Sequence, residues 1–158
     1  MDSTLKSYLE KYKVNYTLYE HPAVFTVTES DEVTKHIPGA RSKNLFLKDD
    51  QKKFYLICMP GHKRLDMKAL KLSIKVKELH FASPEDLKKE LNLTPGSVSI
   101  FGMIHASHTK LLIDKELWEA NQVGFHPNIN TSTLLVNHQA LEIFCKSLSS
   151  PWEVVSLA

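Results

Sequence analysis

Apolar residues recur along this chain with two periods, one typical of helices and one typical of strands. The 3.6-residue period over residues 5–12 predicts a helix that Ser3 or Thr4 can cap. Residues 83–91 predict a second helix, because a serine, a proline and two acids open the segment. Shorter or less regular helical patterns cover residues 28–36, 65–72, 114–119 and 137–148.

Runs of β-branched and aromatic residues predict short strands between these helices. Residues 44–48 and 54–59 flank a short polar loop, so an antiparallel hairpin is expected. Further strands are predicted over residues 16–21, 97–101, 110–113, 131–136 and 152–155, the last as an edge strand. Helices and strands do not alternate as regular βαβ units. The pattern therefore predicts the α+β class, with a mixed, largely antiparallel sheet flanked by helices.

Length and composition fit one globular domain that spans residues 1–158. The chain has 158 residues, of which 42% are hydrophobic and 24% are charged. Lysine and arginine number 20 and the acids 18, so the formal net charge is +2. This balance excludes a histone-like polycation, and any contact with nucleic acid must come from a local basic patch.

The two cysteines form no disulfide framework. Cys58 and Cys145 each follow an apolar run, so both are expected to be small buried hydrophobic residues. The chain begins without the pattern of a signal peptide, and no apolar run approaches the ~18–20 residues that cross a bilayer. We therefore expect a soluble protein of a reducing compartment, the cytoplasm, with no membrane partner.

The sequence carries none of the common motifs for phosphate loops, dinucleotide sites, serine hydrolases, zinc proteases or EF-hands. His105 and His108 are three residues apart, but no acid or cysteine stands at ligand spacing beside them. Surface histidines explain them better. We expect no metal and no cofactor.

Three segments carry residues that could bind a ligand. Lys43 begins the same strand face as two leucines, so it either extends its ammonium to solvent at the sheet edge or projects into a cleft. In residues 125–131, Pro127 restricts the backbone beside His126. In residues 94–102, two glycines bracket an apolar stretch and could let the backbone approach a ligand. An ordinary strand end, a polar turn and a helix terminus explain each segment when it is taken alone.

Four segments together resemble one known family. They are HPAVFTV (21–27), KNLFLKD (43–49), PGSVSIFG (95–102) and FHPNINT (125–131). In this order and spacing they resemble the YbaK/prolyl-tRNA-synthetase-associated editing domains, most closely the free-standing alanyl-tRNA(Pro) deacylases of the PrdX or ProX type. The resemblance covers about residues 5–155 and implies a YbaK-like fold.

The resemblance implies a trans-editing hydrolase, which cleaves the ester between a wrong amino acid and the terminal adenosine of proline tRNA. Lys43 matches the key lysine of the family, and Gly96 matches the glycine of its GxxxP-type loop, in which Ile100 here replaces the proline. The implied catalytic residue is Lys43. The implied substrate-binding residues are Thr26, Asn44, Gly96, Ser97, Ile100, Phe101, Gly102 and His126.

An aminoacyl ester is already activated, so oriented water can attack it without a protein nucleophile. On this hypothesis Lys43 stabilises negative charge near the terminal ribose or phosphate, while backbone groups of residues 96–102 hold the carbonyl oxygen or position water. A pocket walled by Phe25, Thr26, Ile100 and Phe101 would admit alanine and refuse proline.

The partners implied are a mischarged tRNA, held by its acceptor end, and prolyl-tRNA synthetase. Candidate tRNA-binding cations are Arg41, Lys43, Lys63, Arg64, Lys68 and Lys71, although a solvated helix face accounts equally well for the last four. Two alternatives remain open: a deacylase for cysteine- or serine-charged tRNA, and a non-catalytic module that binds tRNA or a synthetase.

Overall fold

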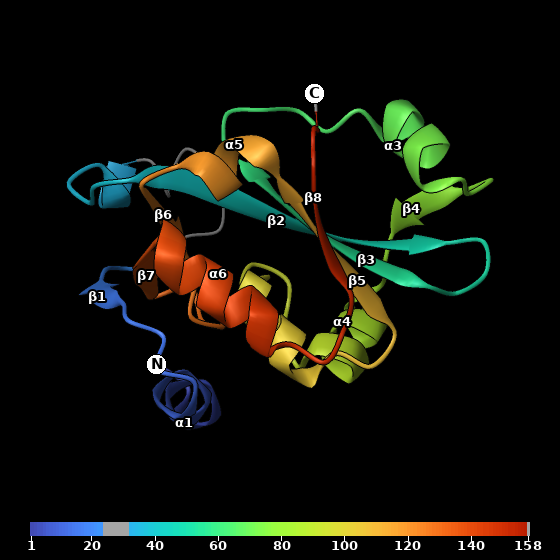
Figure 1. The fold of residues 1–158 in the computed structure, drawn as a ribbon. Coiled ribbons are helices and arrows are strands. Elements are labelled where there is room, and N and C mark those ends of the chain that lie inside the picture. The colour runs from blue at the N-terminus through green and yellow to red at the C-terminus, as the bar shows by residue number, and fades with distance from the viewer. Residues whose placement is uncertain (24–31, 158) are drawn as a thin grey trace.

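The computed structural model describes residues 1–23 and 32–157, and these residues form a mixed β-sheet with helices on both faces (Figure 1). In chain order the elements are α1 (Ser3–Lys11), β1 (Thr17–Glu20), β2 (Ala40–Asp49), β3 (Phe54–Pro60), α3 (Met67–Ile74), β4 (Leu79–Phe81), α4 (Pro84–Leu91), the 3₁₀ helix η1 (Ile100–His105), β5 (Thr109–Asp114), α5 (Lys115–Glu119), β6 (Gln122–Phe125), β7 (Ser132–Asn137), α6 (His138–Ser147) and β8 (Trp152–Val155).

Within the described residues the sheet has eight strands, in the order β1-β7-β6-β2-β3-β5-β8, with β4 paired to β2 as well. Four strand pairs are antiparallel and three are parallel. The predicted α+β class and mixed sheet are confirmed, and β8 is the edge strand that residues 152–155 predict.

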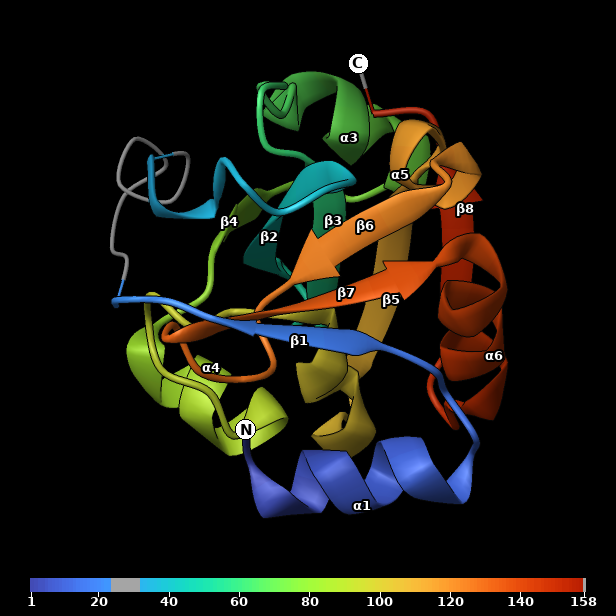
Figure 2. The ribbon, with the colours of Figure 1, turned by 90° about the vertical axis from the view of Figure 1, so that its left-hand side faces the viewer.

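The β2–β3 hairpin forms the centre of the sheet, and alternation along β2 separates two hydrophobic clusters. Phe46 faces the larger cluster, which α1, α4, η1, α5 and α6 cover. Leu45 and Leu47 face the smaller cluster, which α3 covers. The two views show α3 on the side of the sheet opposite α1, α4 and α6 (Figures 1 and 2).

Helix caps follow the sequence with one exception. Ser83 caps α4 and Asn137 caps α6, as predicted, each accepting from a backbone N–H in the first turn. Asp2, not Ser3 or Thr4, caps α1, because its carboxylate accepts from the N–H of Leu5.

Three strand assignments need correction. Residues 97–101, predicted as a strand, lead into η1. Strands β4 and β6 were not predicted, and β6 ends at Phe125, the first residue of the segment 125–131 that the sequence analysis described as a polar turn. Both buried cysteines are confirmed as free thiols. No helix in the described ranges is long and apolar enough to span a membrane.

Candidate active site

A small cavity opens where β2 begins beside β6. The described residues leave about 40 Å³ of space there. Its walls come from the segment before β2, from β2, from the end of β6 and from β7; the lining residues are Thr34, Ile37, Pro38, Gly39, Ala40, Arg41, Ser42, Asn44, Gly124, Phe125, His126 and Thr133. Three predicted site residues, Arg41, Asn44 and His126, therefore meet in one cavity.

Parallel pairing between β2 and β6 brings these residues together. Ala40 and Arg41 pair with Val123 and Gly124. Gly39 enters β2 with φ near +90°, and a Cβ there would stand 2.9 Å from the carbonyl oxygen of Gln122. A larger residue at position 39 would therefore push the two strands apart at the cavity.

His126 presents a neutral imidazole to the cavity. Its Nδ1 lies 3.2 Å from the carbonyl oxygen of Ser132, which can only accept, so Nδ1 carries the proton. Burial lowers the pKa of His126; the Ser132 carbonyl opposes this shift and His21 adds to it. At neutral pH the Nε2 atom is consequently an unprotonated acceptor.

His21 and Thr133 form a second layer beside His126. The Nδ1 atom of His21 lies 2.8 Å from the Pro22 carbonyl, so its Nε2 accepts from the Thr133 hydroxyl at 2.9 Å. The rings of His21 and His126 are 6.4 Å apart. The sequence analysis assigned no role to His21. The dipeptide His-Pro occurs at positions 21–22 and again at 126–127, and this repetition is the signal that could have linked the two histidines.

A hydrogen bond from a buried cysteine orients the side chain of Asn44. Its Oδ1 accepts from the Cys58 thiol at 2.7 Å. Burial, with a smaller contribution from Cys145, raises the pKa of Cys58 well above its usual value, so the thiol stays a donor. Because Oδ1 is engaged, the amide nitrogen of Asn44 remains as the hydrogen-bond donor.

Lys43 leaves β2 on the opposite face from Asn44. It stands opposite Met59 of β3, is half-buried, and shares its face with Leu45 and Leu47 of the smaller cluster. It is not among the described residues that line the cavity. Within the described part of the chain, its ammonium has no ion pair or hydrogen bond.

The predicted tRNA-binding cations differ in their partners. Arg41 is exposed at the cavity, and its Nε donates to Thr34 at 3.1 Å. The ammonium of Lys63 lies 3.3 Å from Asp114 and 3.5 Å from Glu116, so two carboxylates neutralise it. Arg64 is exposed.

Most of residues 96–102 lie in the protein core and not at the cavity. Gly96 is exposed and has φ near +90°, whereas Ser97 is buried. Ile100 and Phe101 are fully buried, and a Cβ at Gly102 would come within 2.6 Å of Leu93. The Phe101 ring packs edge-on against Phe125, 5.7 Å away, and so supports the cavity wall from behind. Phe25 and Thr26 lie outside the described residues.

Comparison with known proteins finds a family whose matched range contains the cavity. The family model "Aminoacyl-tRNA editing domain" matches residues 21–144, a range that begins at His21 and includes every lining residue of the cavity. The chain is similar to the "Prolyl-tRNA editing protein ProX" of Acetoanaerobium sticklandii, with 33% identity over 94% of this chain and 93% of that protein.

A relative from Xenopus laevis, "Prolyl-tRNA synthetase associated domain-containing protein 1", is 32% identical over 90% of this chain and 88% of its own length. A crystal structure described as "a putative trans-editing enzyme for prolyl tRNA synthetase" has the same fold. Its TM-score is 0.77 at 18% identity, over 99% of this chain and 98% of that one.

Proposed function

The chain belongs to the aminoacyl-tRNA editing domain family, and from this membership we propose that it hydrolyses the ester bond of mischarged alanyl-tRNA(Pro). The observation that carries the proposal is the cavity, in which an amide donor and a neutral imidazole face a space too small for a large side chain. The whole-length similarity to a prolyl-tRNA editing protein supports the same substrate class.

Asn44 and His126 supply two parts of the reaction. Water attacks the ester carbonyl carbon, and the carbonyl oxygen becomes an oxyanion that the Asn44 amide stabilises by hydrogen bonding. The Nε2 atom of His126 accepts a proton from the water and returns it to the ribose oxygen when the carbon–oxygen bond breaks. The products are free amino acid and tRNA, and no covalent enzyme intermediate forms.

Lys43 and Arg41 act on the nucleic-acid part of the substrate. Arg41 stands at the cavity, where a terminal phosphate or ribose would enter. Lys43 is adjacent in sequence to Asn44 but leaves β2 on the other face, so we assign its ammonium, which has no ion pair among the described residues, to a backbone phosphate outside the cavity. Both cations would hold the ester in place for attack.

The size of the cavity supports alanine over proline as the amino acid. A space of about 40 Å³ takes a methyl group more readily than a three-methylene ring. A missing methylene changes binding by only about 1–3 kcal/mol, so a synthetase excludes the smaller alanine poorly, and a second, smaller site that refuses proline supplies the remaining discrimination. We place this reaction in the cytoplasm, with prolyl-tRNA synthetase as the partner that releases the mischarged tRNA.

The decisive experiment is a deacylation panel with proline tRNA charged with alanine, serine, cysteine or proline. We expect alanine to be released and prolyl-tRNA to survive. Asn44→Ala should lower kcat by about 10²–10³. Asn121→Ala, the same change at an exposed site, should not. Lys43→Ala should raise KM.

The other outcomes have definite meanings. Faster release of serine or cysteine would identify a deacylase of different specificity. No release from any charged tRNA, with binding retained, would identify a non-catalytic module. A folded Lys43→Ala variant with unchanged kinetics would remove Lys43 from the mechanism.

A further inference from the structure

We infer that a basic groove at the far end of the β2–β3 hairpin is a second binding site, which takes backbone phosphates of the tRNA. This inference rests on the proposed function, since it concerns the same substrate. The groove holds about 900 Å³ and lies between the hairpin loop, α4 and the segment that leads into β5. Figure 1 shows the hairpin tip above α4, on the side of the molecule away from β6 and β7.

The groove concentrates positive charge. Five lysines line it (Lys48, Lys52, Lys53, Lys89 and Lys110) against the two carboxylates of Asp86 and Glu90. The lining therefore carries three net positive charges, whereas the whole chain carries +2. The rest of the chain therefore carries a net charge of −1.

Three of these lysines are exposed and without an ion pair in the described part of the chain: Lys52, Lys53 and Lys89. The other two are already paired, Lys48 with Asp86 at 3.2 Å and Lys110 with Glu153 at 2.9 Å. Lys63, which the sequence predicted to bind tRNA, is neutralised by two carboxylates. We therefore expect the lysines of the groove, and not Lys63, to contact the RNA.

The hairpin loop that carries two of the free lysines is held rigidly. Asp49 is 4% exposed, and its carboxylate accepts from the N–H groups of Gln51 and Lys53 and from the Tyr55 hydroxyl. Lys52 adopts φ near +63°, a backbone conformation that glycine or asparagine usually takes. A fixed loop loses little entropy when its ammonium groups bind phosphate.

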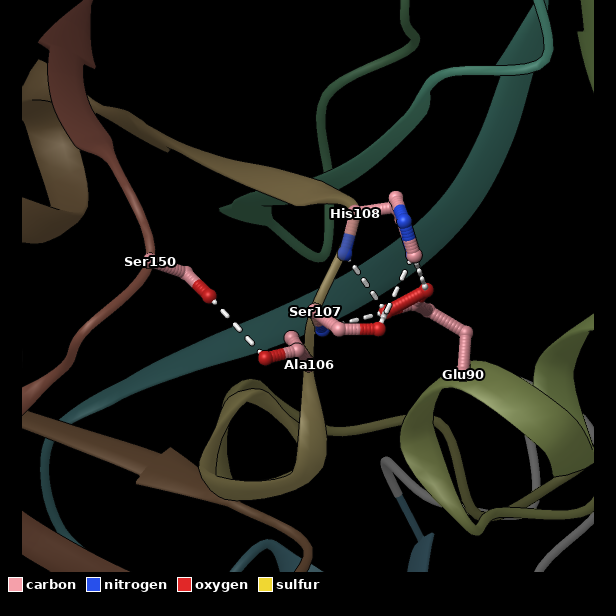
Figure 3. Close-up of polar contacts among 5 residues, drawn as sticks. All are labelled: Glu90, Ala106, Ser107, His108 and Ser150. Atoms are coloured by element: carbon pink, nitrogen blue, oxygen red, sulfur yellow. Dashed lines mark hydrogen bonds and ion pairs between the residues drawn. The ribbon is translucent and has the colours of Figure 1, made fainter.

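The opposite wall is fixed by a buried glutamate. Glu90 of α4 is 5% exposed and accepts from the backbone N–H groups of Ser107 and His108 and from the Ser107 hydroxyl (Figure 3). These hydrogen bonds hold the carboxylate in place, and the groove lining keeps its net charge of +3 with the charge of Glu90 included. Phe54, half-buried at the same groove, stacks on Phe46 with ring centres 5.0 Å apart and adds apolar surface to the groove.

The spacing between groove and cavity fits one RNA end. Asn44 lines the cavity and Lys48 lines the groove, and both side chains leave the same face of β2. Four strand residues span about 13 Å, a distance that a few nucleotides of one RNA strand can bridge. A tRNA whose terminal adenosine enters the cavity thus has backbone phosphates within range of the groove.

The test measures binding of uncharged proline tRNA by fluorescence anisotropy, so it does not depend on catalysis. The variant combines Lys52→Gly, Lys53→Gln and Lys89→Gln. We expect its Kd to rise by about tenfold or more. The negative slope of the logarithm of the association constant against the logarithm of salt concentration should become shallower by about 2–3.

The matched control combines Lys13→Gly, Lys6→Gln and Lys11→Gln, which remove the same charge from α1 and its end. Lys13 has φ near +57°, so both glycine substitutions relieve a similar backbone conformation. Thermal unfolding midpoints should not fall in either glycine variant. Equal weakening of binding in both triple variants, or none in the groove variant, would overturn the inference.

Two further arms separate the remaining readings. With charged substrate, the groove variant should raise KM for full-length tRNA and leave kcat unchanged. A charged dinucleotide of the 3′ end, which is too short to reach the groove, should show no difference. If inorganic phosphate or AMP binding depends on these lysines and tRNA binding does not, the groove serves a small phosphorylated ligand and the inference is wrong. If the wild type releases no amino acid, the proposed function fails while the binding contrast still decides the groove.

Discussion

Cys58 acts on the candidate site through Asn44 and has no exposed surface for chemistry of its own. The thiol is fully buried and donates to the Asn44 side chain at 2.7 Å. In a Cys58→Ala variant the Asn44 amide loses this restraint. One hydrogen bond of about 1 kcal/mol predicts a fall in kcat of about threefold to tenfold, with little change in KM.

Cys58→Ser supplies the matched comparison, because serine keeps a donor at nearly the same place. We expect it to recover most of kcat in a single-turnover deacylation assay. If the alanine and serine variants lose kcat equally, the thiol serves packing only. Urea unfolding of both variants measures the packing loss separately.

The lowered pKa of His126 predicts how activity and stability depend on pH. Burial holds its folded pKa below the ordinary value of 6.5, so the unfolded chain binds a proton first as the pH falls. The contribution of neutral His126 to stability is therefore complete above pH 6.5 and decreases as the pH falls from 6.5 through the folded pKa.

The rate of deacylation should depend on the protonation of His126 as well. We expect kcat to be constant above neutrality and to fall in acid as Nε2 becomes protonated. A His126→Asn variant should lose this acid limb and most of its rate. An acid limb that persists in His126→Asn would assign the titration to another group. An NMR titration of the imidazole measures the pKa directly.

At single positions, the sequence indicated which residues line the cavity better than it indicated which face of the strand opens on it. Asn44 and His126 were both predicted, and they meet because β2 pairs with β6, a contact between residues far apart in the sequence. Alternation along a strand placed Lys43 and Asn44 on opposite faces, and the structure agrees. It could not tell which face opens on a cavity, because that depends on the short strand β6.

The helix η1 packs closely against the end of α4 and against Leu93 at Gly102. A Cβ at Gly102 would lie 2.6 Å from Leu93 Cδ1 and 3.1 Å from Leu91 Cβ. Gly102→Ala should therefore destabilise the fold by about 1–3 kcal/mol, measured by urea unfolding. The double variant with Leu93→Ala should lose less than the sum of the two single losses, because the smaller side chain makes room. Strict additivity would show that the clash is absent.

Elements with local determinants were predicted best. The β2–β3 hairpin depends on a short polar loop between two apolar runs, and α4 on a serine cap followed by proline. Residues 97–101 have the apolar pattern of a strand, but burial of Ile100 and Phe101 against the larger cluster favours a 3₁₀ helix instead. Strands as short as β4 and β6 carry too few residues to show a period.

At the scale of the whole molecule, the segments outside the family match contribute to the core. The match covers residues 21–144, yet Leu5 and Leu9 of α1 are fully buried in the larger cluster. After the match, β8 pairs with β5, and Trp152 packs against Trp118 with ring centres 5.4 Å apart. The cavity and the groove are both formed by the central strands, so their geometry depends on these outer elements.

Removal of residues 150–158 should therefore unfold the protein even though every residue of the candidate site remains. The deletion exposes the edge of β5, where Leu111, Leu112 and Ile113 are fully buried, and removes Leu157 from the smaller cluster. Loss of the buried Leu157 costs about 2–5 kcal/mol, and loss of the partly buried Trp152 and of the β5–β8 pairing adds to it, against a whole stability of about 5–15 kcal/mol for a domain.

We expect the truncated chain to lose its cooperative urea transition and to aggregate through the exposed strand edge, as measured by circular dichroism and light scattering. Leu157→Ala in the full chain is the control. It should lose about 2–5 kcal/mol, keep a cooperative transition and keep deacylation at low temperature. A truncated chain that unfolds cooperatively and still cleaves alanyl-tRNA would show that the central strands hold the cavity without β8. The shape of the cavity would then be independent of the residues that follow the family match, while α1 would remain the outer element that supports it.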